Sequence, residues 1–98
     1  YAEVLFNRGD AYYMLDKYEN AIKDFNKAIQ FGYKNANIYF RRGFSKSSLG
    51  NYKEAILDYN NSLNFEERED TYISRGYVYE LLEQHDKAFE DYKSVLFL

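Results

Sequence analysis

The chain carries Arg8-Gly9-Asp10-Ala11-Tyr12 and, after a short gap, Tyr18-Glu19-Asn20-Ala21-Ile22-Lys23-Asp24-Phe25. Both stretches return twice in altered form. The Arg-Gly pair recurs at Arg42-Gly43 and Arg75-Gly76, and the Ala-(Ile or Phe)-x-Asp-aromatic unit that ends the second stretch recurs at the same intervals. Successive copies lie 34 and then 33 residues apart. A fixed period in this range indicates a repeat architecture, which decides the fold before local propensities are considered.

Divided at this period, the chain forms three units, residues 2–35, 36–68 and 69–98. Small and aromatic residues recur at matching places: Leu5, Gly9, Tyr12, Tyr18, Ala21, Phe25 and Ala28 in the first unit, Tyr39, Gly43, Leu49-Gly50, Tyr52, Ala55 and Tyr59 in the second, and Tyr72, Gly76, Tyr79, Leu82, Ala88, Tyr92 and Val95 in the third. This pattern resembles the tetratricopeptide repeat, a helix–turn–helix unit of about 34 residues. Ser62 and His85 depart from the family pattern, and the chain has no Pro between units.

The resemblance implies an all-α fold, a right-handed α-solenoid of three helix–turn–helix repeats with six antiparallel helices in a single domain, residues 1–98. Asp16 with Glu19, and Asn51 with Glu54, have the spacing of helix-capping pairs. Gly32 is placed to close the second helix. The predicted helices are 2–15, Asp16 to Phe31-Gly32, 36–49, 52–64, 70–82 and 86–97.

Three Gly residues, three Arg residues and three Asp residues share the period. Gly in the middle of a helix costs about 1 kcal/mol relative to Ala, so Gly9, Gly43 and Gly76 predict a close approach between paired helices. We expect the small partners opposite them to be Ala21, Ala55 and Ala88. The Arg series (Arg8, Arg42, Arg75) and the Asp series (Asp24, Asp58, Asp91) have opposite charge, which favours ion pairs within each helix pair over a row of ligand-binding Arg residues.

Composition places limits on the classes of function. The net charge is −3, which disfavours nucleic acid and an anionic membrane as partners. No stretch approaches the ~18 apolar residues of a membrane-spanning helix. The chain has no Cys, which is compatible with a reducing compartment and favours the cytoplasm slightly, although the compartment stays unknown. Because the chain begins at Tyr1 rather than Met and ends in a helical pattern, we expect it to be a piece of a longer protein.

The sequence offers no set of catalytic residues. There is one His, His85, which fits a structural or surface role, and no Cys that could act as a nucleophile or bind zinc. The Gly residues follow the repeat spacing and do not form a phosphate-binding loop. The acidic run 66–70 is typical of a solvated or helix-capping segment rather than a metal site. We therefore predict a protein that is not an enzyme and uses no metal or cofactor.

In the family that the chain resembles, the first helix of each repeat lines a concave groove that binds extended peptides of partner proteins. Here the matching positions include Phe6, Phe40, Phe44 and Tyr77, aromatic residues outside the signature positions. They motivate the prediction of a partner-binding groove, although some of them could instead be core residues between repeats. The predicted groove residues are Phe6, Asn7, Asp10, Tyr13, Asn37, Phe40, Arg41, Phe44, Ser74 and Tyr77.

The same face carries four acids, Glu3, Asp10, Asp70 and Glu80, against one base, Arg41. This balance predicts a protein or peptide ligand with apolar anchors and some positive charge. Co-chaperone members of the family clamp the acidic C-terminus of heat-shock chaperones with Lys, Asn and Arg. The matching places here hold Phe6, Asp10, Arg41, Asp70 and Ser74, so a carboxylate clamp is not expected.

Two other functions stay open. The last helix carries Phe89, Leu96, Phe97 and Leu98, and a terminal repeat without a polar cap predicts self-assembly, as a homo-oligomer through the C-terminal helix. The third possibility is a regulatory domain of an enzyme whose active site lies elsewhere in the parent chain. The leading prediction is a non-catalytic protein–protein interaction module.

Overall fold

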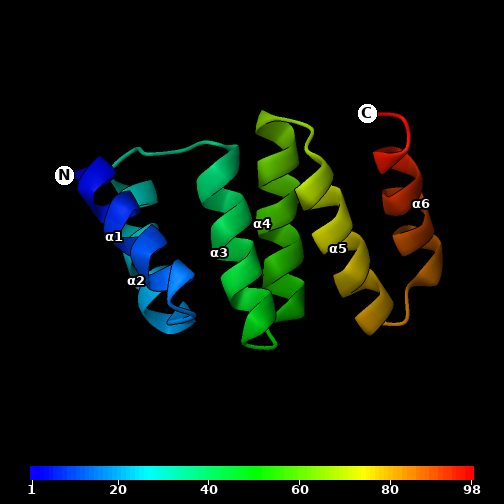
Figure 1. Cartoon of the computed structure of the whole chain (residues 1–98), viewed down its shortest axis with the longest axis horizontal. Helices are drawn as coiled ribbons and strands as arrows, with labels where there is room; N and C mark the ends of the chain where they lie inside the picture. The colour runs from blue at the N-terminus through cyan, green and yellow to red at the C-terminus, as the bar shows by residue number, and fades with distance from the viewer.

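The structure is a computed structural model that describes residues 1–98 as helices and short connections. The helices follow one another along the longest dimension of a body of 40 × 25 × 20 Å (Figure 1). None of them is long and apolar enough to cross a membrane. The predicted all-α solenoid is confirmed, and its helices begin and end within two residues of the predicted positions. Their bounds are α1 Ala2–Met14, α2 Tyr18–Gln30, α3 Ala36–Ser48, α4 Tyr52–Phe65, α5 Glu69–Leu81 and α6 His85–Val95.

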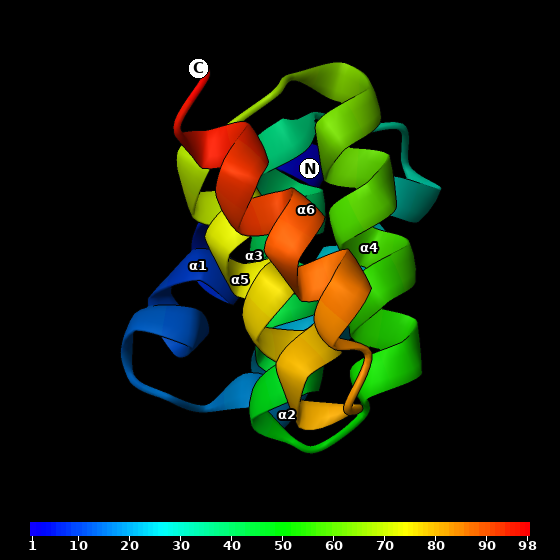
Figure 2. The same cartoon turned by 90° about the vertical axis from the view of Figure 1, so that its right-hand side faces the viewer.

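The helices pack as three antiparallel hairpins: α1 with α2, α3 with α4, and α5 with α6. Adjacent hairpins meet at two junctions, which we call junction 1–2 and junction 2–3. The first helices approach one another across both junctions, since α1 and α3, and likewise α3 and α5, bring Cα atoms within 8 Å of each other. The pairs α2 with α4 and α4 with α6 do not. The first helices are therefore closer together than the second helices, which makes their side the concave one. Figure 2 shows the stack from the α6 end.

The turn inside each hairpin has one residue in the left-handed region, at Asp16 (φ 59°), Gly50 (φ 85°) and Glu83 (φ 59°). After Asp16, the amide of Lys17 donates to the carbonyl of Tyr12 at 2.9 Å, which closes the end of α1. Asp16 therefore ends α1, and the prediction that it caps α2 is wrong. Its carboxylate accepts a hydrogen bond from the Tyr18 hydroxyl at 3.0 Å.

The other caps agree with the sequence only in part. Asn51 is the N-cap residue of α4, but its side chain accepts no capping hydrogen bond. The side chain that does cap a helix is Asn35, whose Oδ1 accepts from the amide of Ile38 at 2.9 Å at the start of α3. Gly32 has φ 95° and follows Phe31, the C-cap residue of α2, as predicted for a residue that closes a helix.

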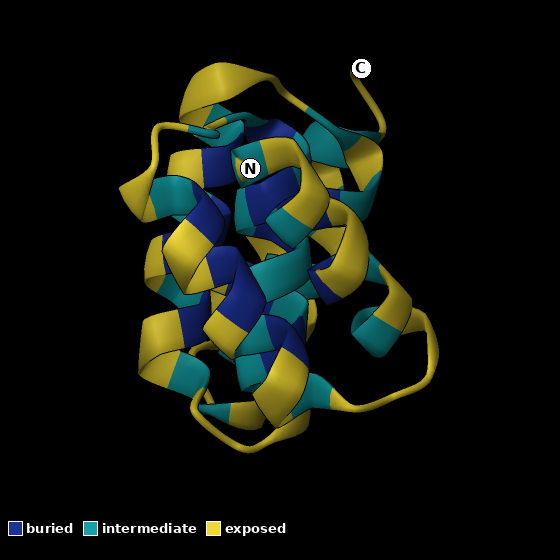
Figure 3. Ribbon diagram, turned by 90° about the vertical axis from the view of Figure 1, so that its left-hand side faces the viewer, coloured by how far each residue is buried: buried dark blue, intermediate teal, exposed yellow.

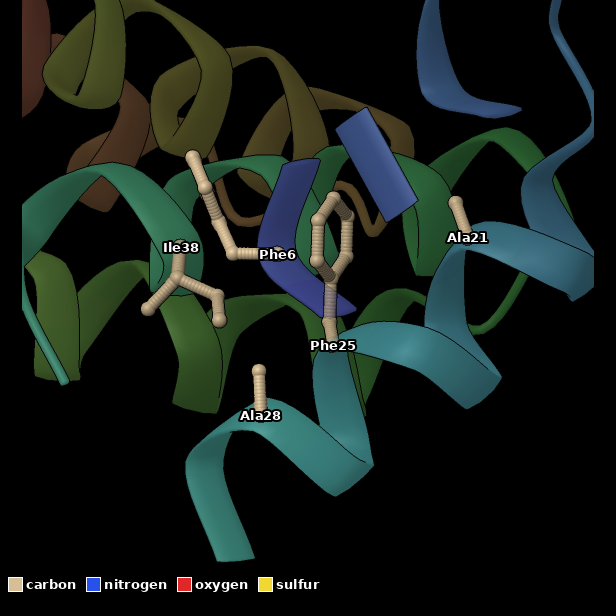
Figure 4. Packing of buried hydrophobic residues seen from close by; sticks show 5 residues of the cluster. All are labelled: Phe6, Ala21, Phe25, Ala28 and Ile38. Atoms are coloured by element: carbon tan, nitrogen blue, oxygen red, sulfur yellow. The ribbon is translucent and has the colours of Figure 1, made fainter. Parts of the chain in front are cut away.

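Buried residues lie on the faces where helices meet, with exposed residues on the outside (Figure 3). One core cluster belongs to junction 1–2, where side chains from α1, α2 and α3 converge (Figure 4). Its buried members are Phe6, Ala21, Phe25, Ala28 and Ile38. A second cluster, formed by Phe40, Ala55, Tyr59 and Val78, joins the second hairpin to the third.

The mid-helix glycines mark close approaches, as predicted, but their partners differ from the prediction. A Cβ placed on Gly43 would lie 2.9 Å from Cε1 of Tyr59 and 3.0 Å from Cβ of Asp58, closer than side chains pack. The equivalent contacts are Gly9 with Phe25 at 2.8 Å and Gly76 with Tyr92 at 2.7 Å. The residue opposite each Gly is thus an aromatic ring rather than Ala21, Ala55 or Ala88, because the flat ring needs the space that a missing side chain leaves.

Candidate functional site

The repeated Arg and Asp residues pair within each hairpin, as predicted. Each Arg donates two hydrogen bonds, from Nε and Nη2, to the two carboxylate oxygens of a buried Asp. The distances are 2.8 and 2.9 Å for Arg8–Asp24, 2.9 and 2.7 Å for Arg42–Asp58, and 2.9 and 2.6 Å for Arg75–Asp91. The hydrogen bond and charge of Asp91 raise the pKa of Arg75. These pairs hold the two helices of a hairpin in register and occupy the Nε and Nη2 donors of each Arg.

Two of these Arg residues also connect neighbouring hairpins. Nη1 of Arg42 donates to Oδ1 of Asn26 at 2.9 Å, and Nη1 of Arg75 donates to Oδ1 of Asn60 at 2.8 Å. Each Asn lies on the second helix of the preceding hairpin. The same polar bridge therefore occurs at both junctions. The sequence analysis missed it, although Asn26 and Asn60 share the repeat period.

Two of the predicted groove residues are core residues. Phe6 is 8% exposed and stacks on Tyr33, with ring centroids 4.9 Å apart. Phe40 is 9% exposed and packs against Tyr59 at 5.9 Å. Their rings lie within the two core clusters rather than facing solvent, which is the alternative that the sequence left open.

Junction 1–2 is filled on its concave side. Arg41 on α3 forms an ion pair with Asp10 on α1, and its guanidinium lies 5.3 Å from the ring centroid of Tyr13. Phe44 packs edge-on against Tyr13 at 5.7 Å and lies 6.3 Å from Tyr18. Burial raises the pKa of Tyr13, although the Arg41 charge opposes this shift. The structure thus brings four predicted site residues together in one packed, internally paired group.

Arg68, at the start of α5, is a concave-side residue that the sequence analysis missed. It donates two hydrogen bonds to Asp70, at 3.1 and 2.7 Å, and one to Oδ1 of Asn37 at 3.2 Å. Its guanidinium lies 5.6 Å from the ring centroid of Phe40. Asp10 and Asp70 are therefore both neutralised by Arg residues, and the predicted acidic excess of this face is reduced to Glu3 and Glu80.

Junction 2–3 contains a hollow where junction 1–2 is filled. Its volume is about 460 Å³, and it opens between α3 and α5 with α4 and α6 behind them. No charged residue lines it. The lining residues are Phe44, Ser47, Ser48, Tyr52, Tyr59, Ile73, Ser74, Tyr77, Leu81 and Tyr92. Three of the predicted groove residues, Phe44, Ser74 and Tyr77, meet here, whereas Asn7 is exposed on α1 away from this hollow.

Two tyrosine hydroxyls belong to this hollow. Tyr59 is 1% exposed, and burial strongly raises its pKa, while the adjacent hydroxyls of Ser47 and Ser74 act in the opposite direction. Burial and then the Glu80 carboxylate beside it raise the pKa of Tyr92 to about 12. Both side chains therefore carry neutral hydroxyl groups at physiological pH.

Comparison with protein families accounts for this arrangement of helices and turns. Two family models of the tetratricopeptide repeat match the chain, one over residues 2–31 and the other over residues 36–68 and 69–96. The chain belongs to the tetratricopeptide repeat family. No curated protein matches the chain significantly. Tetratricopeptide repeats form protein–protein interaction modules that bind proteins or peptides, and the family is generally non-catalytic.

Solved tetratricopeptide structures superpose closely on the chain. MamA is 28% identical with a TM-score of 0.90, and the match covers 97% of this chain and 56% of MamA, so the chain spans little more than half of that protein. The second tetratricopeptide domain of Spaghetti (RPAP3), solved with the HSP90 peptide SRMEEVD, is 24% identical over 99% of this chain and 91% of that one, with a TM-score of 0.91. The Arabidopsis OM64 domain is 24% identical over 99% and 81%, with a TM-score of 0.92.

Proposed function

We propose that residues 1–98 act as one non-catalytic domain that binds an extended peptide segment of a partner protein on the concave face. The observation that carries this proposal is an apolar stripe on α5. Ile73, Tyr77 and Leu81 follow one another at intervals of four residues and are 43–56% exposed, on the helix that faces the concave side. Aromatic and aliphatic side chains exposed in a concave surface are typical anchors of peptide interfaces.

The paired charges favour a ligand that binds chiefly through apolar groups. Asp10 and Asp70 have Arg partners within the chain, so neither carboxylate needs a basic residue from the ligand. A preference for some positive charge rests on Glu3 and Glu80 alone. We therefore expect the affinity for a peptide to depend only weakly on salt concentration, because few charges are neutralised on binding.

The charges also argue against recognition of an acidic chaperone tail. The HSP90 peptide in the RPAP3 structure ends in two Glu residues, a Val and an Asp. On the concave face of this chain, Arg41 is already paired with Asp10 and Arg68 with Asp70. Binding an acidic peptide here would require breaking one of these pairs, which supports the proposal that the domain is not a carboxylate clamp.

A random peptide library displayed on phage tests the proposed function directly. Wild-type domain is expected to select a set of related peptides with apolar residues. Their affinity, measured by isothermal titration calorimetry, should fall at least tenfold in Tyr77→Ala. The matched control is Leu57→Ala, since Leu57 is 62% exposed on α4, away from the concave face, and should leave the affinity unchanged within about twofold.

Selection of no related peptides, or an equal loss of affinity in both variants, would argue against the groove. A synthetic SRMEEVD peptide provides the second arm. We expect it to bind at least tenfold more weakly than the selected peptides, and tight, salt-sensitive binding would overturn the exclusion of the chaperone tail.

A second candidate function is self-assembly through α6. Leu96 and Phe97 at its end are 81% and 82% exposed, and Phe89 is also exposed on the same helix. Light scattering at several concentrations separates this function from peptide binding. A mass that rises with concentration in wild type, and stays that of a monomer in Phe89→Ser/Phe97→Ser, would support assembly through this helix.

A further inference from the structure

The hollow at junction 2–3 exists because two side chains are small. Ser47 lies 34 residues after Tyr13, and Ser74 lies 33 residues after Arg41, so each pair shares a register in successive hairpins. In junction 1–2, Tyr13 and Arg41 stack on one another and close the corresponding space. In junction 2–3, the two Ser residues leave about 460 Å³ open. This volume lies within the ~300–1,000 Å³ that is usual for ligand sites.

The lining of the hollow has a defined chemical character. Apolar and aromatic side chains supply its walls, among them Phe44, Ile73 and Tyr77. The polar groups are hydroxyls, and Ser47, Ser74 and the buried Tyr59 line the hollow together. An ionised ligand group would lose its hydration there without meeting an opposite charge. An aliphatic group would pack against the apolar walls but would leave the hydroxyls without the hydrogen bonds that water gives them.

We propose that this hollow is the anchor site of the groove and that it binds one tyrosine side chain of the partner peptide. The ring would pack against Phe44 and Tyr77, and the phenol hydroxyl, both a donor and an acceptor, would exchange hydrogen bonds with Ser47, Ser74 and Tyr59. This inference rests on the proposed function and adds the residue type that the groove selects. It also implies that phosphorylation of the ligand tyrosine prevents binding, because the lining offers no basic group to a phosphate.

The side chain alone, in the form of p-cresol, tests the anchor site without a peptide. In two-dimensional NMR of the whole chain, p-cresol is expected to shift the signals of residues around the hollow, such as Ser47, Ser74 and Tyr77. Ser47→Tyr places in junction 2–3 the ring that Tyr13 places in junction 1–2, and it should weaken p-cresol binding at least tenfold. Leu57→Tyr adds the same ring on α4, away from the concave face, and should leave binding within twofold of wild type.

Ser74→Leu is a second way to fill the hollow if Ser47→Tyr does not fold. It should weaken p-cresol binding by the same factor of at least ten. The phosphorylated analogue, p-tolyl phosphate, should bind at least tenfold more weakly than p-cresol. The proposal is overturned if p-cresol leaves the pocket signals unshifted, if both filling variants bind it as wild type does, or if the phosphate analogue binds as tightly as p-cresol.

The peptides selected by phage display separate failure of the anchor site from failure of the proposed function. Tyrosine-containing peptides that lose at least tenfold in affinity with Ser47→Tyr support both proposals. Peptides that bind but are indifferent to Ser47→Tyr leave the groove intact and overturn the anchor site. Binding of p-cresol without any selected peptide overturns the proposed function, and with it the peptide as the source of the tyrosine.

Discussion

Junctions 1–2 and 2–3 share a backbone plan but differ in how their concave sides are filled. Both have an Arg that pairs with a buried Asp and reaches an Asn of the preceding hairpin. Junction 1–2 then adds the ion pair of Arg41 with Asp10 and the packing of Phe44 on Tyr13. Junction 2–3 has Ser residues at two of these places and a hollow between them.

The difference separates the residues that hold the stack together from those that are free to change. In junction 2–3, Ser residues replace Tyr13 and Arg41 of the register and leave a space, while the bridge from Arg75 to Asn60 still joins the two hairpins. A repeat architecture can therefore place a ligand site at one junction and, at the next, a filled surface whose charged groups are paired within the chain.

Arg42→Ala is expected to have the largest effect, since it removes part of the framework that the junctions share. The Asp58 side chain is 2% exposed and would lose the guanidinium that donates two hydrogen bonds to its carboxylate. The remaining cation is Lys46, whose Nζ lies 3.3 Å from Oδ2 of Asp58. We predict a loss of about 2–3 kcal/mol in the free energy of unfolding, measured by urea denaturation. Arg75→Ala should cost a similar amount if the two junctions depend equally on this framework.

Asn26→Ala is the matched control for the bridge alone. It removes one exposed hydrogen bond and should cost less than about 1 kcal/mol. A loss below 1 kcal/mol in Arg42→Ala would mean that Lys46 suffices to compensate Asp58, and the shared framework would then be weaker than its geometry suggests.

Phe44→Ala and Tyr77→Ala test the difference between the junctions, because the two residues share a register. Phe44 packs on Tyr13, Tyr18 and Phe40. Its loss should cost about 2 kcal/mol, less than the 3–5 kcal/mol of a fully buried Phe. Tyr77 is 56% exposed beside the hollow, and its loss should cost less than about 1 kcal/mol in the same urea experiment. Equal losses of unfolding free energy in the two variants would contradict the contrast between a filled and an open junction.

The smallest expected effect is a decline in stability at high pH, to which Tyr59 and Tyr92, the two tyrosines with the largest pKa shifts, contribute. Tyr59 and Tyr92 have raised pKa values, about 12 for Tyr92, against ~10 in an unfolded chain, whereas the first hairpin has the non-ionising Phe25 at this place. The folded state favours the neutral phenols. Their contribution to stability is therefore complete below pH ~10 and is lost as the pH rises toward 12 and beyond.

Urea denaturation between pH 9 and 11.5 should show this decline, and Tyr92→Phe should reduce it. Absorbance of tyrosinate in the folded chain provides the check, since Tyr59 and Tyr92 should ionise after the exposed tyrosines. A Tyr92→Phe variant with the same pH dependence as wild type would assign the decline to other groups.

The repeat period in the sequence was enough to predict the helices, their pairing and the Arg–Asp series. These features depend on residue types at fixed intervals, and such intervals can be measured along the sequence alone. The errors are local and have physical causes. Asp16 has the spacing of an N-cap, but its backbone adopts the left-handed conformation of the turn that ends α1, so it does not cap α2. The glycines signalled a close approach, yet only the packed structure reveals that rings rather than Ala residues lie opposite them.

The candidate site was predicted less completely, because its properties depend on side chains from different hairpins. The sequence by itself determined the family and the solenoid, since repeated small and aromatic residues can bury their surface only by stacking hairpins. The resemblance to the family implied which helices form the concave side. Only the tertiary structure decided that Phe6 and Phe40 are buried, that Asp10 and Asp70 are paired, and that Ser47 and Ser74 line the same hollow as Tyr59. Filling, pairing and cavities arise between helices that are far apart in sequence, so no single repeat encodes them.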